Sequence, residues 1–256
     1  MIKRTVYYML ILGIFTGALV CAVLAVKDAA PFIKSDWEIR QLREEVKAEE
    51  HDPNGKETTR DNIHWDQLRK INADIVAWIT VPGTKIDYPV LQCSTWNEYL
   101  HKDYKGEYSY PGSIFIQPGV SFFDQHVVVY GHNMVSRAMF GSLHDYESKD
   151  FARKHPDVYI YERGRTIHAR IYSTYDCEDA SETYRTYFQT EKEWVTWLTM
   201  TVKDNYYDMG VVPVKEDRVI TLSTCSMGRS EDSRYTVHSV VQKRTEDIDE
   251  DQMEGD

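Results

Sequence analysis

Three side chains in this chain could together transfer an acyl group. Cys225 ends a short β-branched run, Val219 to Thr224, which is typical of a buried strand. Arg234 follows nine residues later, and His132 follows a second apolar run, Val127 to Tyr130. A thiolate is a nucleophile, an imidazole can move a proton, and a guanidinium can stabilise an anion. The pattern predicts a cysteine-dependent acyl-transfer site with Cys225, His132 and Arg234 as catalytic residues.

Competing interpretations of the same residues are weaker. The chain has nine histidines, and His132 stands out because it follows a glycine where a strand is expected to end. Arg234 could instead form a surface ion pair with Glu231 or Asp232. Neither CxxC nor HExxH occurs, so no metal site is expected, and GxSxG, the Walker loop and GxGxxG are absent.

The cysteine count supports a reactive thiol. Cys21 falls in the apolar N-terminal run, which leaves Cys93, Cys177 and Cys225 outside it. Three is an odd number, so at least one thiol is unpaired or pairs between chains. The sequence alone does not decide whether Cys93 and Cys177 form a disulfide. An unpaired thiol in an oxidising compartment is a candidate reactive group.

The N-terminus has the pattern of a membrane anchor. Lys3 and Arg4 precede an uncharged apolar run, residues 6–26, which is long enough to cross the hydrocarbon core as a helix. Basic residues before the run favour a cytoplasmic N-terminus, residues 1–5, and an extracellular remainder. A cleaved signal peptide is the alternative. We expect a single-pass protein of the cell membrane.

The net negative charge of the chain argues against nucleic acid as a partner. Without Lys3, Arg4 and Lys27, 27 basic residues remain against 41 acidic ones. Residues 246–256 hold seven of the acids, and we expect them to be a disordered tail.

The remaining pattern is mainly β. Residues 27–60 are expected to be a juxtamembrane helix (35–50) and a linker, and 61–245 a catalytic domain that begins with a helix at 61–71. Short strands with Gly and Pro turns predict a barrel or sandwich, and one strong helix is expected at 191–205. The expected strands are 76–81, 86–91, 113–117, 127–130, 158–161, 166–175, 211–212, 219–224 and 235–242.

These motifs resemble the sortase family, and more narrowly class B sortases. The resemblance rests on the TLSTC run 221–225, on Arg234-Tyr235, and on the YGHN run 130–133. It covers about residues 63–241. Further matching stretches are 72–79, 82–90, 112–115 and 139–143.

The resemblance implies a fold and an activity. The fold is a closed eight-stranded sortase-type β-barrel with N-terminal helices and one inserted helix before the nucleophile strand. The activity is transpeptidation: Cys225 forms a thioester at a Thr-Gly-type bond of a C-terminal sorting signal on a secreted protein. An amine of the peptidoglycan cross-bridge or its precursor, or a pilin lysine, then resolves the thioester.

The resemblance also implies roles for single residues. His132 acts as acid and base, and Arg234 binds the oxyanion or the substrate. Ser223, Leu100 and Tyr184 are candidates for the substrate-binding pocket, and no cofactor is expected. Signal specificity is expected in the loop 176–189, because binding residues favour loops on a rigid scaffold.

Other functions stay open from the sequence. One is a pilus-polymerising class B sortase. Another is an inactive, membrane-tethered binding domain. An L,D-transpeptidase-like cross-linker also uses Cys and His, but its His-Gly and Ser-x-Gly-Cys context is missing here.

Overall fold

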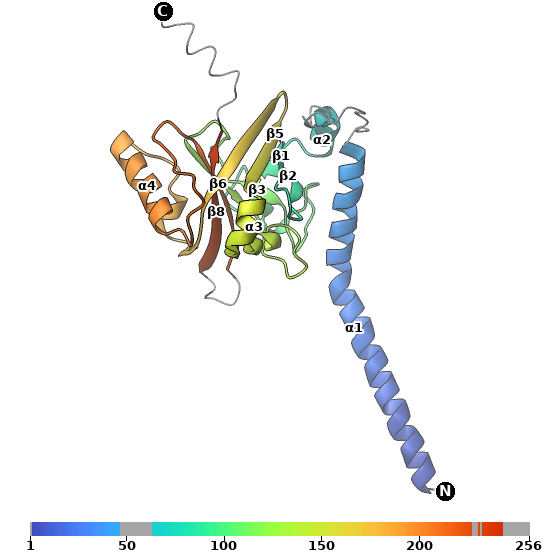
Figure 1. Cartoon of the computed structure of the whole chain (residues 1–256). Coiled ribbons are helices and arrows are strands. Elements are labelled where there is room, and N and C mark those ends of the chain that lie inside the picture. Colours follow the sequence, from blue (N-terminus) through green and yellow to red (C-terminus); the bar gives the residue numbers. More distant parts are fainter. Residues whose placement is uncertain (1, 47–62, 227–229, 231, 243–256) are drawn as a thin grey trace, which may run out of the picture.

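The computed structural model describes residues 2–46, 63–226, 230 and 232–242. Figure 1 shows a barrel of strands with a long helix beside it. The helices are α1 (Ile2–Val46), α2 (Trp65–Ile71), α3 (Lys149–Lys154) and α4 (Glu191–Lys203), with 3₁₀ turns η1 (Glu98–His101), η2 (Gly141–Glu147) and η3 (Glu182–Tyr184). The strands are β1 (Ile75–Thr80), β2 (Asp87–Gln92), β3 (Ile114–Ile116), β4 (His126–Tyr130), β5 (Asp157–Glu162), β6 (Arg165–Glu178), β7 (Val219–Cys225) and β8 (Ser233–Val241).

The strands form one closed barrel in the order β1-β2-β3-β4-β7-β8-β6-β5. The β2–β3 and β4–β7 pairs are parallel, and the other pairs are antiparallel. Pairing of β1 with β5 closes the barrel, so none of these eight described strands is left with an unpaired edge. The expected closed eight-stranded barrel is therefore confirmed.

Helix α4 covers the outside of the barrel just before the nucleophile strand. Thr190 caps its N-terminus by accepting a hydrogen bond from the Glu193 amide, at 3.2 Å. Trp194, Trp197 and Leu198 lie on one buried face, as helical spacing requires. They pack with residues of β6, β7 and β8 in a small second core. The expected inserted helix is thus present.

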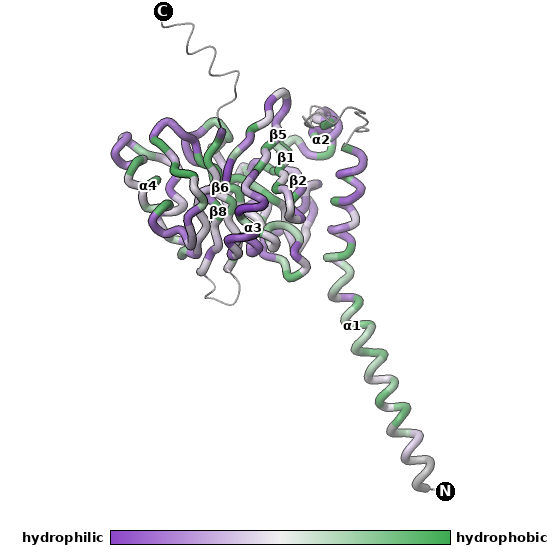
Figure 2. The backbone as a smooth tube through the Cα atoms, in the orientation of Figure 1, coloured by the Kyte–Doolittle hydropathy of each residue, from purple (hydrophilic) through white to green (hydrophobic). Residues whose placement is uncertain are grey.

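The N-terminal region differs from expectation, because α1 is one continuous helix over Ile2–Val46. The apolar run 6–26 and residues 35–46 of the expected helix 35–50 belong to the same element. Pro31 lies inside it, and an interior proline can bend a helix without ending it. From residue 7 onward, the helix is long and apolar enough to cross a membrane. Figure 2 shows the apolar residues on the part of α1 that extends away from the barrel.

Two further expectations need correction. Residues 211–212 do not form a strand, because Gly210 adopts a positive φ of 72° and Pro213 has no amide hydrogen to donate. The helix expected at 61–71 begins at Trp65. Residues 47–60, which hold the end of the expected helix 35–50 and the linker after it, and the tail 246–256 lie outside the described residues.

A chain of buried histidines crosses three neighbouring strands. Nδ1 of His126 (β4) lies 2.7 Å from the Arg185 carbonyl, and its Nε2 lies 2.7 Å from the Thr221 hydroxyl. That hydroxyl lies 2.8 Å from Nδ1 of His238 (β8). A carbonyl only accepts, so His126 carries its hydrogen on Nδ1. Thr221 therefore donates to His126 and accepts from His238.

Burial holds both imidazoles neutral. It lowers the pKa of His126 to about 4 and the pKa of His238 well below its usual value. The Nε2 of His238 is buried without a hydrogen-bond partner among the described residues. In the unfolded chain both rings take up a proton near pH 6.5, so protons favour unfolding.

We predict that the free energy of unfolding falls as the pH drops from about 6.5 towards about 4. For His126 alone, the loss is on the order of 3 kcal/mol. Denaturant titrations of the full chain in detergent, followed by tryptophan fluorescence across this range, measure it. The variant His126→Gln should show a flatter dependence, whereas His64→Gln, at an exposed position, should match wild type. Equal slopes in wild type and His126→Gln would contradict the prediction.

Candidate active site

The catalytic candidates meet at one end of three neighbouring strands. In the parallel pair β4–β7, Tyr130 is the register partner of Ser223. His132 and Cys225 each follow two residues later, so both emerge from the same edge of the barrel. In the antiparallel pair β7–β8, Cys225 is the direct partner of Arg234. Sheet register thus brings together residues that are far apart in the sequence.

All six predicted site residues line one groove of about 510 Å³. The catalytic candidates His132, Cys225 and Arg234 share it with the predicted binding residues. The binding candidates in the groove are Ser223, Leu100 and Tyr184. Within the described residues, no group of three or more His, Cys, Asp or Glu side chains lies close enough together to hold a metal ion.

His132 is held by a backbone carbonyl. Its Nε2 lies 2.8 Å from the Leu100 oxygen, which can only accept, so Nε2 carries a hydrogen and Nδ1 has the lone pair in the neutral ring. Gly112 makes room for that carbonyl, since a Cβ there would lie 2.2 Å from the Leu100 oxygen. Burial lowers the pKa of His132, and the neighbouring His101 adds to this, while the Leu100 bond opposes it. The neutral imidazole is therefore favoured.

The backbone of Cys225 is held by two residues that the sequence reasoning did not select. The Cys225 carbonyl accepts a 2.8 Å hydrogen bond from Asn133 Nδ2 and lies 3.1 Å from Nε2 of His144. The other His144 nitrogen lies 2.8 Å from Glu147, and its ring stacks on Tyr235. The Cys225 side chain itself is exposed. A fixed backbone and an exposed side chain suit a nucleophile.

Arg234 forms an ion pair with another groove residue. Its Nη2 lies 3.2 Å from Asp179 Oδ2, and its Nη1 donates to the Ser233 carbonyl at 3.1 Å. The expected alternative partners were Glu231, which lies outside the described residues, and Asp232. A partly exposed pair of this kind contributes little to stability. The guanidinium can therefore exchange Asp179 for a substrate oxygen at small cost.

Stacked aromatic rings form one wall. Phe115 stacks on Tyr130 with ring centroids 5.5 Å apart, and Tyr130 stacks on Tyr184 at 6.1 Å. The Tyr184 hydroxyl is 2.8 Å from Ser223 Oγ. Cys177 Sγ lies 3.8 Å from the same hydroxyl, and all four cysteines are free. The Cys93–Cys177 disulfide that the sequence left open is thus not formed.

Several groove residues were missed by the sequence reasoning. Asn97 adopts a positive φ of 59° and exchanges hydrogen bonds with Gln117. Trp96 also lines the groove. Asp179, the partner of Arg234, and Thr186 line it too; neither was selected singly, but both lie in the loop 176–189 where signal specificity was expected. Asn97 was detectable, because Asn tolerates left-handed backbone.

The fold and this groove define the class of protein. The family model of the sortase domain matches residues 79–242, more than half of the chain. The chain therefore belongs to the sortase family, whose members are cysteine transpeptidases.

The relatives narrow the class further. The sortase B of Listeria monocytogenes is 37% identical over 161 residues, or 62% of this chain and 65% of that protein. The sortase B of Staphylococcus aureus is 31% identical over 175 residues, or 68% of this chain and 72% of that one. A solved S. aureus sortase B–substrate complex superposes with a TM-score of 0.71 at 26% identity, covering 86% of this chain and all of that one. The resemblance to class B sortases is confirmed.

We predict that Asn133 and His144 act on Cys225 as one unit. Asn133→Ala and His144→Ala should each slow alkylation of Cys225 several-fold, because each removes a partner of the same carbonyl. The double variant should lose less than the product of the two effects, since the groups share one acceptor. Alkylation is followed by peptide mapping, which separates Cys225 from the other thiols. Fully independent effects, or unchanged rates, would show that this carbonyl does not position the thiol.

Proposed function

We propose that this protein is a membrane-anchored cysteine transpeptidase. It cleaves a C-terminal sorting signal at a Thr-Gly-type bond and transfers the secreted protein to an amine of the cell wall. The observation that carries the proposal is the groove that Cys225, His132 and Arg234 share. The anchor is the apolar part of α1, with the N-terminus in the cytoplasm and the barrel outside the cell.

Acylation begins with proton transfer from the Cys225 thiol to Nδ1 of His132. The Leu100 carbonyl fixes the tautomer, and burial favours the neutral, basic form of the ring by lowering its pKa. The thiolate attacks the Thr carbonyl carbon. As the tetrahedral intermediate collapses, His132 returns the proton to the departing Gly amine, and a thioester remains on Cys225.

Arg234 stabilises the negative charge that develops in the tetrahedral intermediate. The carbonyl oxygen becomes an oxyanion, and a guanidinium in the same groove can replace Asp179 as its partner. Stabilisation of such an oxyanion contributes several kcal/mol in a site sheltered from water. Transfer then follows in reverse order: the acceptor amine gives a proton to His132, attacks the thioester, and releases the Cys225 thiol as the new amide forms.

The groove wall suggests how the signal is held. Ser223 and Tyr184 form a hydrogen-bonded pair beside Cys225, and Leu100 lies next to His132. One relative was solved as a complex with substrate and one as a complex with triglycine. These complexes belong to the relatives, and they support a peptide substrate and an amine acceptor for this chain.

We predict that Cys225→Ala and His132→Ala abolish cleavage of fluorogenic sorting-signal peptides. Arg234→Ala should lower kcat/KM by two or more orders of magnitude, about 2.7 kcal/mol or more. Arg234→Lys should fail as well, because one ammonium does not reproduce the two-pronged guanidinium. Full activity of Cys225→Ala would refute the proposed function, and an Arg234→Ala variant within threefold of wild type would remove arginine from the mechanism.

The acceptor is tested separately. We expect a short peptide amine that mimics a cross-bridge to divert the thioester from hydrolysis to transfer, with product identified by mass spectrometry. Ladders of linked pilin subunits on denaturing gels, with no transfer to the cross-bridge mimic, would instead assign the enzyme to pilus assembly.

A further inference from the structure

The part of α1 that follows the apolar run is docked on the barrel. Ile39, Leu42 and Val46 are buried in the same core as the barrel strands. The Arg43 Nε donates to the Asp87 carbonyl at 2.6 Å, and Glu38 forms a 3.1 Å ion pair with Lys105. This part of α1 is therefore held in a defined position.

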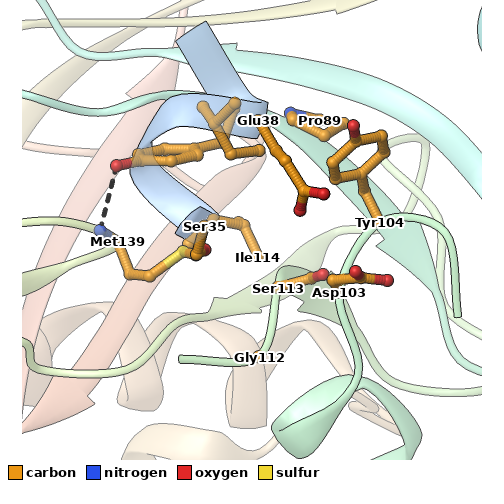
Figure 3. A pocket seen from close by; sticks show the side chains of 11 residues that line it. Ser35, Glu38, Pro89, Asp103, Tyr104, Gly112, Ser113, Ile114 and Met139 are labelled. Carbon is orange, nitrogen blue, oxygen red and sulfur yellow. Dashed lines mark hydrogen bonds between the residues drawn. The ribbon is translucent and has the colours of Figure 1, made fainter. Parts of the chain in front are cut away.

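Side chains of α1 and the barrel leave only a small cavity at one point of their interface. Figure 3 shows Ser35 and Glu38 of α1 facing Pro89, Tyr104 and Ile114 of the barrel side. The cavity that remains between them is about 10 Å³, the size of one water molecule at most. Such close packing transmits the position of the helix to the loops beneath it.

From this interface a chain of rings leads to the catalytic histidine. Phe32 of α1 meets Tyr110 edge to face, with centroids 5.5 Å apart and planes at 81°. Tyr110 stacks on His132, with centroids 6.3 Å apart and planes at 11°. His101 contacts both, at 6.1 Å from Tyr110 and 5.4 Å from His132. The Phe32–Tyr110 and Tyr110–His132 geometries match edge-to-face and stacked aromatic pairing, respectively.

We propose that Phe32 and Tyr110 are positioning residues for His132, so that the anchor helix completes the active site. The Leu100 carbonyl fixes one nitrogen of the imidazole, but a single hydrogen bond leaves the ring free to rotate about it. The stacked face of Tyr110 removes that freedom, and Phe32 holds Tyr110 in place. This inference rests on the proposed function for its meaning in catalysis.

We expect the rings that cover His132 to influence its protonation. Burial is the main reason that its pKa lies below the usual value. Other titratable groups near the ring are His101 and Tyr110 on one side, and Cys225, Asp179 and Arg234 in the groove. Removal of Phe32 or Tyr110 exposes the imidazole to water, so its pKa should rise towards the ordinary value.

The test uses the full chain in lipid nanodiscs, with two readouts. Phe32→Ala should lower kcat for a sorting-signal peptide by about two- to tenfold with little change in KM, and it should raise the His132 pKa measured by NMR of labelled histidines. Tyr110→Ala should do the same, more strongly. The conservative Phe32→Tyr and Tyr110→Phe keep the rings and should stay near wild type. The matched control is Ile33→Ala, at an exposed neighbouring position of α1.

The outcomes separate this inference from the proposed function. If Phe32→Ala matches Ile33→Ala in both kcat and His132 pKa, the inference is wrong while the transpeptidase assignment stands. An equal loss in Phe32→Tyr would also overturn it, because the ring would then be irrelevant. If the wild type cleaves no sorting-signal peptide, the proposed function fails, and the His132 pKa of the variants still decides whether α1 supports the ring.

Discussion

The parallel pairing of β4 with β7 is the constraint on which the site depends. Parallel strands end at the same edge of a sheet, so a histidine and a cysteine placed two residues beyond a register pair must emerge side by side. A strand end also leaves carbonyls without ladder partners. At Cys225 the side chains of Asn133 and His144 satisfy that carbonyl. Cys225 therefore has an exposed thiol and a backbone carbonyl whose position is held by two side chains.

Residues outside the groove hold both of its walls in position. On one side, the buried chain from His238 through Thr221 to His126 ends on the Arg185 carbonyl, directly after Tyr184, so it ties the aromatic wall to β7. On the other side, Gly112 allows the Leu100 carbonyl to reach the histidine. Catalytic groups need such support, because errors of an ångström in placement cost much of the rate.

The sequence predicted those features that short segments encode. The strands that lead to Cys225 and His132 are β-branched runs, and the nucleophile motif lies within one of them, so the catalytic candidates followed from the residues. The same pattern left a barrel and a sandwich open, and the closed eight-stranded barrel was implied by the resemblance to class B sortases. Asn133 and His144 were not selected, because their common target is a carbonyl far away in the chain. The residue pair 211–212 was predicted as a strand on propensity alone, but a β-strand needs a partner. An anchor at 6–26 and a separate helix at 35–50 were expected, yet packing of α1 on the barrel extends one helix to Val46.

The docked helix also fixes where the groove lies in the proposed topology. At a rise of 1.5 Å per residue, Phe32 lies about 9 Å beyond the end of the apolar run at Val26. Tyr110, which contacts it, stacks on His132. A flexible linker would let the barrel sample every orientation above the bilayer, whereas a helix packed against β2 allows few. If the apolar run spans the membrane as proposed, these contacts hold the Tyr110 side of the groove near the end of that run. Substrates tethered to the membrane surface would then meet the thiol at high effective concentration.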